Sequence, residues 1–225
     1  MKPRRAFNQL TKSGFIPWSV LGLFFLIGGC AIVQSGGEVQ SGRADLFAGR
    51  PEDALVHFRR AAELNPDYVT GFTVFKEGVW TYIGRASYET QNLPEARRAL
   101  ENASSRRSDD YLAKLYLGLT LARDGDRQRG LSEIESGMKG LYDWLEDVSQ
   151  THRYSYGEFW DPQREIRSQI RTDLALLSTR ELDWPKLIAA GESVGKRMEE
   201  EIDRADREER FFRGRPGDND SGGHR

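Results

Sequence analysis

The sequence predicts an all-α protein made of stacked helical hairpins, and three observations lead to that fold class. Ala54 and Ala61 lie seven residues apart, so they share one face of a helix, and Phe58 lies between them on the same face. Small residues of this kind recur farther along the chain at a fixed distance. No segment shows the period-two alternation that several strands would require.

The first hairpin lies between Gly42 and Pro66, where Gly49 marks the turn and the proline ends the second helix. Small residues recur after a spacing of 34 residues, from Gly84 to Gly118 and from Ala96 to Gly130. The step from the first unit to the second is longer, at 42 residues. This excess is about two helical turns, and it predicts a lengthened helix over residues 68–88.

These signatures resemble the tetratricopeptide repeat (TPR), a helical hairpin of 34 residues. The second unit opens with Trp80, Ile83 and Gly84, close to the W-x-x-L-G of that family. The third unit has Gly130 and Gly137 in place of both alanines, and each glycine weakens a helix by about 1 kcal/mol. The resemblance covers residues 35–144 and implies a TPR-like solenoid of about three repeats. The alternative is an ordinary helical bundle with accidental spacing.

The amino terminus has the layout of an export signal. Four basic residues and no acid precede an apolar run at about residues 15–27, followed by Gly28, Gly29 and Cys30. Residues 26–30 are similar to the lipobox of bacterial lipoproteins, which implies that Cys30 is diacylated and becomes the mature amino terminus. Cys30 is the only cysteine, so it has no disulfide partner within the chain.

An uncleaved membrane helix is the alternative for the same segment. Residues 14–33 carry no charge, and 20 residues are long enough to span a bilayer. Basic residues before the span would keep the amino terminus in the cytoplasm, so both hypotheses place the rest of the chain in the periplasm. Ala31 is not the aspartate that signals inner-membrane retention in enteric bacteria, which favours an outer-membrane lipoprotein over a single-pass inner-membrane protein.

Composition limits the partners of the soluble part. The 33 basic residues include four in segment 1–30, which leaves 29 against 35 acidic residues. This acidic balance argues against a nucleic-acid partner, which requires a basic face. About 195 residues are enough for one hydrophobic core.

The part after the repeats is predicted to consist of capping helices. Segment 31–144 holds the repeats, 145–203 holds helices that pack on the open end of the solenoid, and 204–225 is a charged, glycine-rich tail expected to be disordered. Asp161 and Pro162 are typical of a helix start, and Trp184-Pro185 opens another helix.

The sequence gives little sign of catalytic chemistry. The histidines at 57, 152 and 224 have no metal-ligand spacing, and no phosphate-binding or nucleophile motif occurs. Glu158, Asp161 and Glu165 lie near aromatic residues and raise the possibility of a glycosidase, although Asp161 is also needed as a helix cap. We therefore predict a protein that is not an enzyme and that needs no cofactor or metal.

The resemblance implies a binding groove on the first helix of each hairpin. Carried onto this chain, the groove residues are Tyr82, Arg85, Tyr88, Glu89, Tyr116, Leu119 and Arg123. Tyrosine and arginine suit partner recognition because they combine contact area with hydrogen bonding. The prediction is a membrane-anchored scaffold that binds unidentified proteins in the bacterial envelope and assists assembly of a complex. The alternatives are a peptidoglycan-active enzyme or its regulator, and a structural spacer.

Overall fold

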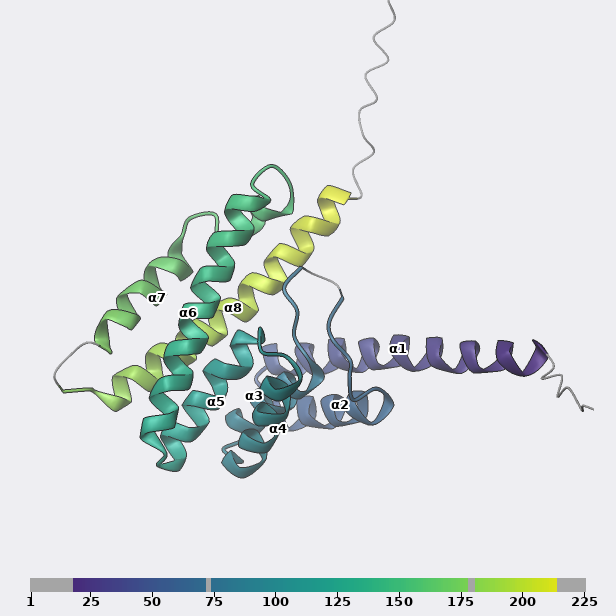
Figure 1. Cartoon of the computed structure of the whole chain (residues 1–225), viewed down its shortest axis with the longest axis horizontal. Coiled ribbons are helices and arrows are strands. Elements are labelled where there is room, and N and C mark those ends of the chain that lie inside the picture. The colour runs from purple at the N-terminus through teal and green to yellow at the C-terminus, as the bar shows by residue number, and fades with distance from the viewer. Residues whose placement is uncertain (1–17, 72–73, 178–180, 214–225) are drawn as a thin grey trace, which may run out of the picture.

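The structure is a computed structural model that describes residues 18–71, 74–177 and 181–213, without the side chains of residues 18–31 and 212–213. Over these residues the chain forms eight α-helices, one 3-10 helix and no strand, which confirms the all-α prediction (Figure 1). The elements are α1 (Trp18–Phe47), α2 (Pro51–Leu64), α3 (Val79–Glu89), α4 (Leu93–Arg106), α5 (Tyr111–Asp124), α6 (Arg127–Thr151), η1 (Tyr156–Phe159), α7 (Glu165–Leu176) and α8 (Trp184–Arg213).

Local sequence signals set the ends of the helices. The side chains of Asn92, Asp110 and Asp126 accept hydrogen bonds from backbone amides in the first turns of α4, α5 and α6. Gly49 and Gly125 close α1 and α5 with φ of 70° and 99°, a conformation that glycine adopts without steric cost. These caps divide the chain into successive hairpins.

Successive helices pack as neighbouring pairs, α1 on α2, α3 on α4 and α5 on α6. In each pair a glycine of the first helix lets the second helix approach closely. A Cβ atom at these glycines would lie 2.3–2.5 Å from the nearest atom of the partner helix, well inside van der Waals contact. The contacts pair Gly42 with Phe58, Gly84 with Leu100 and Gly118 with Ile134.

The last helix, α8, runs diagonally across the body and packs on α5, α6 and α7 (Figure 1). Two glycines on α8 allow a close approach to α5, since a Cβ at Gly191 would lie 2.8 Å from Leu119 and one at Gly195 would lie 2.6 Å from Tyr116. The apolar stripe of α8 is fully buried in the larger of two hydrophobic clusters. Its members are Leu187, Val194, Met198, Ile202 and Ala205.

The predicted long helix over residues 68–88 is wrong in its first half, because α3 begins only at Val79. Residues 68–71 and 74–78 lie outside any helix instead, and backbone hydrogen bonds pair the two segments as a folded-back loop. The amide of Thr70 donates to the carbonyl oxygen of Glu77 at 2.9 Å, and the amide of Val79 donates to the carbonyl oxygen of Tyr68 at 3.0 Å. Gly71 and Gly78 within this insertion disfavour a helix, which explains the difference.

The structure also differs from the expected disordered tail, because α8 continues to Arg213. Pairs spaced four residues apart, such as Arg204 with Glu208 at 2.7 Å, support this helical end. Ala205 is fully buried, and Glu209 accepts a hydrogen bond from the indole of Trp160 at 3.3 Å. Charge spacing along a helix therefore outweighs the polar composition that suggested disorder. Residues 214–225 lie outside the described residues.

The amino-terminal part of α1 extends beyond the rest of the helical body (Figure 1). Among the helices of the described residues, none combines the length and the apolarity needed to cross a bilayer. The predicted export signal falls mostly on residues 1–17 and on the side chains of residues 18–31, including Cys30, which lie outside the described part. The lipoprotein hypothesis and its alternative therefore stay predictions.

Candidate functional site

The structure brings the predicted groove residues together but covers most of them. They lie on α3 and α5, on the side where α8 packs. Glu89 and Arg123 remain exposed. The other five are buried, with at most 4% of their surface accessible, namely Tyr82, Arg85, Tyr88, Tyr116 and Leu119. These residues therefore do not line an open groove. Residues of α8 contact four of them, and Phe58 of α2 stacks on the ring of Tyr82 with 5.1 Å between ring centres.

Glu192 of α8 holds the outer part of this surface. Its Oε1 accepts a hydrogen bond from the hydroxyl of Tyr88 at 2.5 Å and another from Nη2 of Arg123 at 2.5 Å. The guanidinium of Arg123 also lies 4.5 Å from the centre of the Tyr88 ring, within the range of a cation–π contact. Two predicted groove residues thus bind α8 itself.

A buried charge cluster, formed by Arg43, Glu77, Tyr82, Arg85 and Glu199, lies deeper between α1, α3 and α8. Nη1 of Arg85 donates to Glu77 Oε1 at 2.9 Å and to Glu199 Oε2 at 2.6 Å. Nε of Arg43 donates to the other oxygen of Glu199 at 2.8 Å. The hydroxyl of Tyr82 donates to Glu77 Oε2 at 2.8 Å. The cluster ties α8 to the first two hairpins.

The two carboxyl groups of this cluster titrate differently. Burial and the nearby charge of Glu199 raise the pKa of Glu77 to about 7, although Arg85 works in the opposite direction. Burial would also raise the pKa of Glu199, but Arg85 and Arg43 together hold it below its ordinary value. Glu199 is therefore the carboxylate that stays charged, while Glu77 changes its protonation near neutral pH.

A pocket of about 610 Å³ lies where α8 does not fill the space between the ends of α1, α3 and α5. This volume falls within the usual range for ligand pockets, roughly 300–1,000 Å³. Leu46 and Phe47 from the end of α1 form an apolar wall, and Phe47 is 48% exposed. The other wall is polar and includes Arg85, Glu89 and Lys196.

Most charged groups of the pocket are already paired with one another. Arg85 pairs with Glu199, Arg123 with Glu192 at 2.5 Å, and Lys196 with Glu200 at the longer distance of 3.9 Å. Glu89 makes no hydrogen bond or ion pair with any residue that the structure describes. Burial raises its pKa, and Arg85 only partly offsets that effect. Glu89 is thus the unpaired charge of the pocket.

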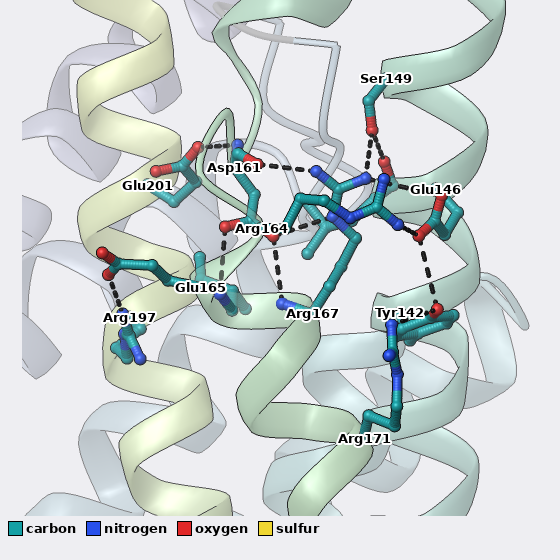
Figure 2. A network of polar contacts seen from close by, with 12 residues as sticks. Tyr142, Glu146, Ser149, Asp161, Arg164, Glu165, Arg167, Arg171, Arg197 and Glu201 are labelled. Carbon is teal, nitrogen blue, oxygen red and sulfur yellow. Dashed lines mark hydrogen bonds and ion pairs between the residues drawn. The ribbon is translucent and has the colours of Figure 1, made fainter.

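Two of the three carboxylates suggested for glycosidase chemistry, Asp161 and Glu165, are engaged in a different network (Figure 2), and the third, Glu158, is exposed. The predicted helix start at Asp161 and Pro162 is wrong by three residues, because α7 begins at Glu165 with Arg164 at its N-cap. The Asp161 carboxylate still accepts hydrogen bonds from the amides of Ile166 at 3.0 Å and Arg167 at 3.1 Å in the first turn of α7. Nε of Arg167 donates to the same carboxylate at 2.9 Å, and Glu165 pairs with Arg197 at 2.6 Å. These contacts give Asp161 a structural role.

Two of the three histidines, His57 and His152, also make contacts that hold the fold, and His224 lies outside the described residues. Nδ1 of His57 lies 2.7 Å from Glu38, and its Nε2 lies 3.6 Å from Asp45, so this side chain links α2 to α1. His152 stacks on Tyr156 with 4.4 Å between ring centres. Within the described residues, no three or more metal-binding side chains gather where they could hold an ion.

The most important groups that sequence reasoning missed are Glu77, Glu192 and Glu199. Glu192 and Glu199 lie seven residues apart, so they share one face of α8, and that spacing was a usable signal. No sequence pattern indicated that Glu77 would be buried, because its burial depends on the folded-back loop before α3.

Comparison of the chain with protein-family models, with curated proteins and with solved structures gives no significant match. The resemblance to tetratricopeptide repeats is therefore a proposal that depends on the contacts of this chain alone. The pocket beside the buried charge cluster has the geometry of a binding site.

Proposed function

We propose that this protein is a membrane-anchored, TPR-like scaffold that binds protein partners in the bacterial cell envelope and assists assembly of an envelope complex. One observation supports the proposal above the others. In all three hairpins, the glycine of the first helix contacts the residue 16 positions later, at Phe58, Leu100 and Ile134. A glycine contact repeated at the same spacing in each hairpin is what a repeated structural unit would produce.

The second helices support the same interpretation. Ala54 and Ala61 of α2 are fully buried, and their counterparts in α4 are buried as well. In α6 a Cβ at Gly130 would lie 2.8 Å from the backbone of Ala122, and one at Gly137 would lie 2.5 Å from that of Leu115. Small residues at equivalent places hold the hairpins closed, as a stacked-repeat scaffold requires.

The partner surface we propose is the pocket and not the covered groove. Releasing α8 would expose the side chains of Leu187, Val194, Met198 and Ile202, all at most 1% accessible in the fold. Each such side chain contributes roughly 1.5–3 kcal/mol, so the release would cost more than about 6 kcal/mol. This cost would cancel most of the binding free energy of a partner of ordinary affinity. A partner that binds the exposed rim around Phe47, Glu89 and Arg123 avoids this cost, because α8 stays in place.

The anchor in this proposal is the segment before the repeats, attached either through a lipid on Cys30 or as an uncleaved helix. The unbroken path of α1 from Trp18 into the first hairpin would couple the anchor rigidly to the body. Mass spectrometry of the mature amino terminus decides between a lipid-modified Cys30 and an intact Met1. Cys30→Ser should abolish processing of a lipoprotein and leave an uncleaved anchor unchanged.

The experiment that tests partner binding compares two charge reversals at exposed arginines. Arg123→Glu lies at the pocket. Arg98→Glu lies on α4 outside the pocket, where the Arg98 side chain makes no ion pair with a described residue and donates a hydrogen bond to the carbonyl oxygen of Pro94 at 3.3 Å. After crosslinking in native membranes, Arg123→Glu should lose co-purified proteins that the wild type and Arg98→Glu retain. Identical sets of co-purified proteins from all three chains would refute the pocket as the partner surface.

A structural spacer is the second candidate, and one observation favours it. Because α8 packs over α5, the described part of the chain has no long open groove along the predicted groove residues of the kind that a peptide-binding solenoid uses. A spacer would hold membrane components at a fixed distance through its ends and would tolerate charge reversal at the pocket. The comparison of Arg123→Glu with Arg98→Glu therefore separates the two functions.

A further inference from the structure

We propose that the pocket between α1, α3, α5 and α8 binds a basic side chain, lysine or arginine, presented by the partner polypeptide, with Glu89 as its counter-ion. The inference rests on the proposed function, since it names the chemistry of the partner at that same site. Three independent features of the pocket lead to it: its charge balance, its apolar wall and a buried donor without an acceptor.

The charge balance calls for a cation. Four carboxylates and three cationic groups line the pocket. Three of these carboxylates have a cationic partner: Glu192 pairs with Arg123, Glu200 with Lys196, and Glu199 with both Arg85 and Arg43. Glu89 is the lining carboxylate that has no ion pair among the described residues, and its partial desolvation beside the pocket makes an incoming cation more favourable there than at an open surface. An acidic group would instead meet like charge.

The apolar wall suits the stem of such a side chain. Lysine and arginine carry three or four methylene groups behind the charge, and these groups gain free energy when they lie against apolar surface. Leu46 and Phe47 offer that surface directly beside the polar wall, and Phe47 is among the few large apolar side chains that remain exposed. A compact metal ion or a small ammonium ion would make no use of this wall.

The buried donor points to the backbone of a peptide. Arg85 lines the pocket and is only 2% exposed, and its Nε has no hydrogen-bond partner within the described part of the chain. A buried donor left unpaired costs about 1–3 kcal/mol, and a carbonyl oxygen entering with the ligand would recover it after a small shift of the walls. The volume of about 610 Å³ leaves room for a backbone segment beside one long side chain.

Titration of the full-length protein in detergent with defined peptides tests the inference. The probe is acetyl-Gly-Gly-Lys-Gly-Gly-amide, and the comparison peptides carry norleucine or glutamate at the central position. Binding is followed by nuclear magnetic resonance shifts of the backbone amides of Phe47 and Tyr88. We expect the lysine peptide to bind about tenfold more tightly than the norleucine peptide, because a charge-assisted hydrogen bond contributes roughly that much. The glutamate peptide should bind most weakly.

Glu89→Gln and Glu63→Gln form the matched pair of variants. Both remove one exposed carboxylate from a helix, but Glu63 lies on α2 away from the pocket. Glu89→Gln should abolish the preference for lysine over norleucine, and Glu63→Gln should keep it. Far-ultraviolet circular dichroism of each variant shows whether the fold is intact.

Equal binding of the lysine and norleucine peptides by the wild type would overturn the inference, and so would an unchanged lysine preference in Glu89→Gln. Either result leaves the scaffold proposal separately testable, because loss of co-purified proteins from Arg123→Glu does not depend on what the partner inserts. If that loss occurs without a lysine preference, only the basic side chain is refuted.

Discussion

The seam between α5 and α6 provides a sharp test of the repeat packing through Gly118→Ala. A Cβ at residue 118 would lie 2.5 Å from the backbone nitrogen of Ile134 and 2.7 Å from the carbonyl oxygen of Gly130. Both obstacles are backbone atoms, so no side chain can rotate away. The two helices must separate by about 1 Å to restore an ordinary contact, and that movement loosens the packing around it.

The expected magnitude is the balance of two effects. Overpacking of a well-packed interior costs about 1–3 kcal/mol, and an obstacle of backbone atoms belongs at the upper end of this range. Alanine also recovers about 1 kcal/mol because glycine is a poor helix former. Gly118→Ala should therefore lower the free energy of unfolding by about 2 kcal/mol.

Gly37→Ala is the matched control for this substitution. Gly37 also lies within a helix, but a Cβ there would meet nothing within 4 Å. The helix-propensity gain acts alone, so this variant should be more stable than the wild type by up to about 1 kcal/mol. Urea denaturation followed by tryptophan fluorescence measures all three proteins. If the two alanine variants unfold at the same urea concentration, the close helix contact proposed for the repeat seam is refuted.

Three further predictions follow from the burial of charged groups. Glu199→Gln removes the carboxylate shared by two buried arginines and should lower the free energy of unfolding, measured by urea denaturation, by about 3–5 kcal/mol. The control Glu200→Gln, on the exposed face of α8, should change it by less than about 0.5 kcal/mol. Equal effects of the two substitutions would contradict the buried pairing. The folded-state pKa of Glu77, about 7, lies above its ordinary value of 4.5, so its protonation stabilises the fold at low pH and this stability is lost as pH rises through 7. Unfolding at pH 5 and pH 8 should differ by up to about 3 kcal/mol from this group, and Glu77→Gln should flatten the difference; an unchanged slope would show that other groups produce it. Truncation after residue 203 removes the end of α8, which carries the partner of Trp160, and should lower the melting temperature. Truncation after residue 213 keeps this end and should leave the melting temperature unchanged. Equal melting temperatures of the two truncated proteins would contradict the packed end of α8.

The hairpins could be predicted from the sequence because their signals are local. Ala54, Phe58 and Ala61 are close in sequence and share a helix face, and all three are fully buried in the structure. The positions of the glycines predicted where the later hairpins begin and turn, because these signals are also local in the sequence. The cap at Asp161 was also readable, since its side chain contacts amides only five and six residues away.

The closed groove could not be predicted, because it depends on contacts between distant segments. Arg85 and Glu199 lie 114 residues apart, and Arg43 and Glu199 lie 156 apart. From the sequence, each of these charges is as compatible with a solvated helix face as with a buried pair. The repeat pattern predicted a first helix that carries Tyr82 and Arg85, and both lie on α3, but Arg85 faces Glu199 of α8 and Tyr82 stacks on Phe58 of α2, so neither faces a partner.

Site-specific photo-crosslinking in native membranes tests the central claim, that partners engage the pocket and not the outer face of the scaffold. Benzoylphenylalanine replaces Phe47 at the pocket in one protein and Val56 on α2 in the other, two exposed apolar positions that are 48% and 63% accessible. The account predicts a crosslinked partner protein from position 47 and none from position 56. The same adducts from both positions, or adducts from position 56 alone, would contradict it.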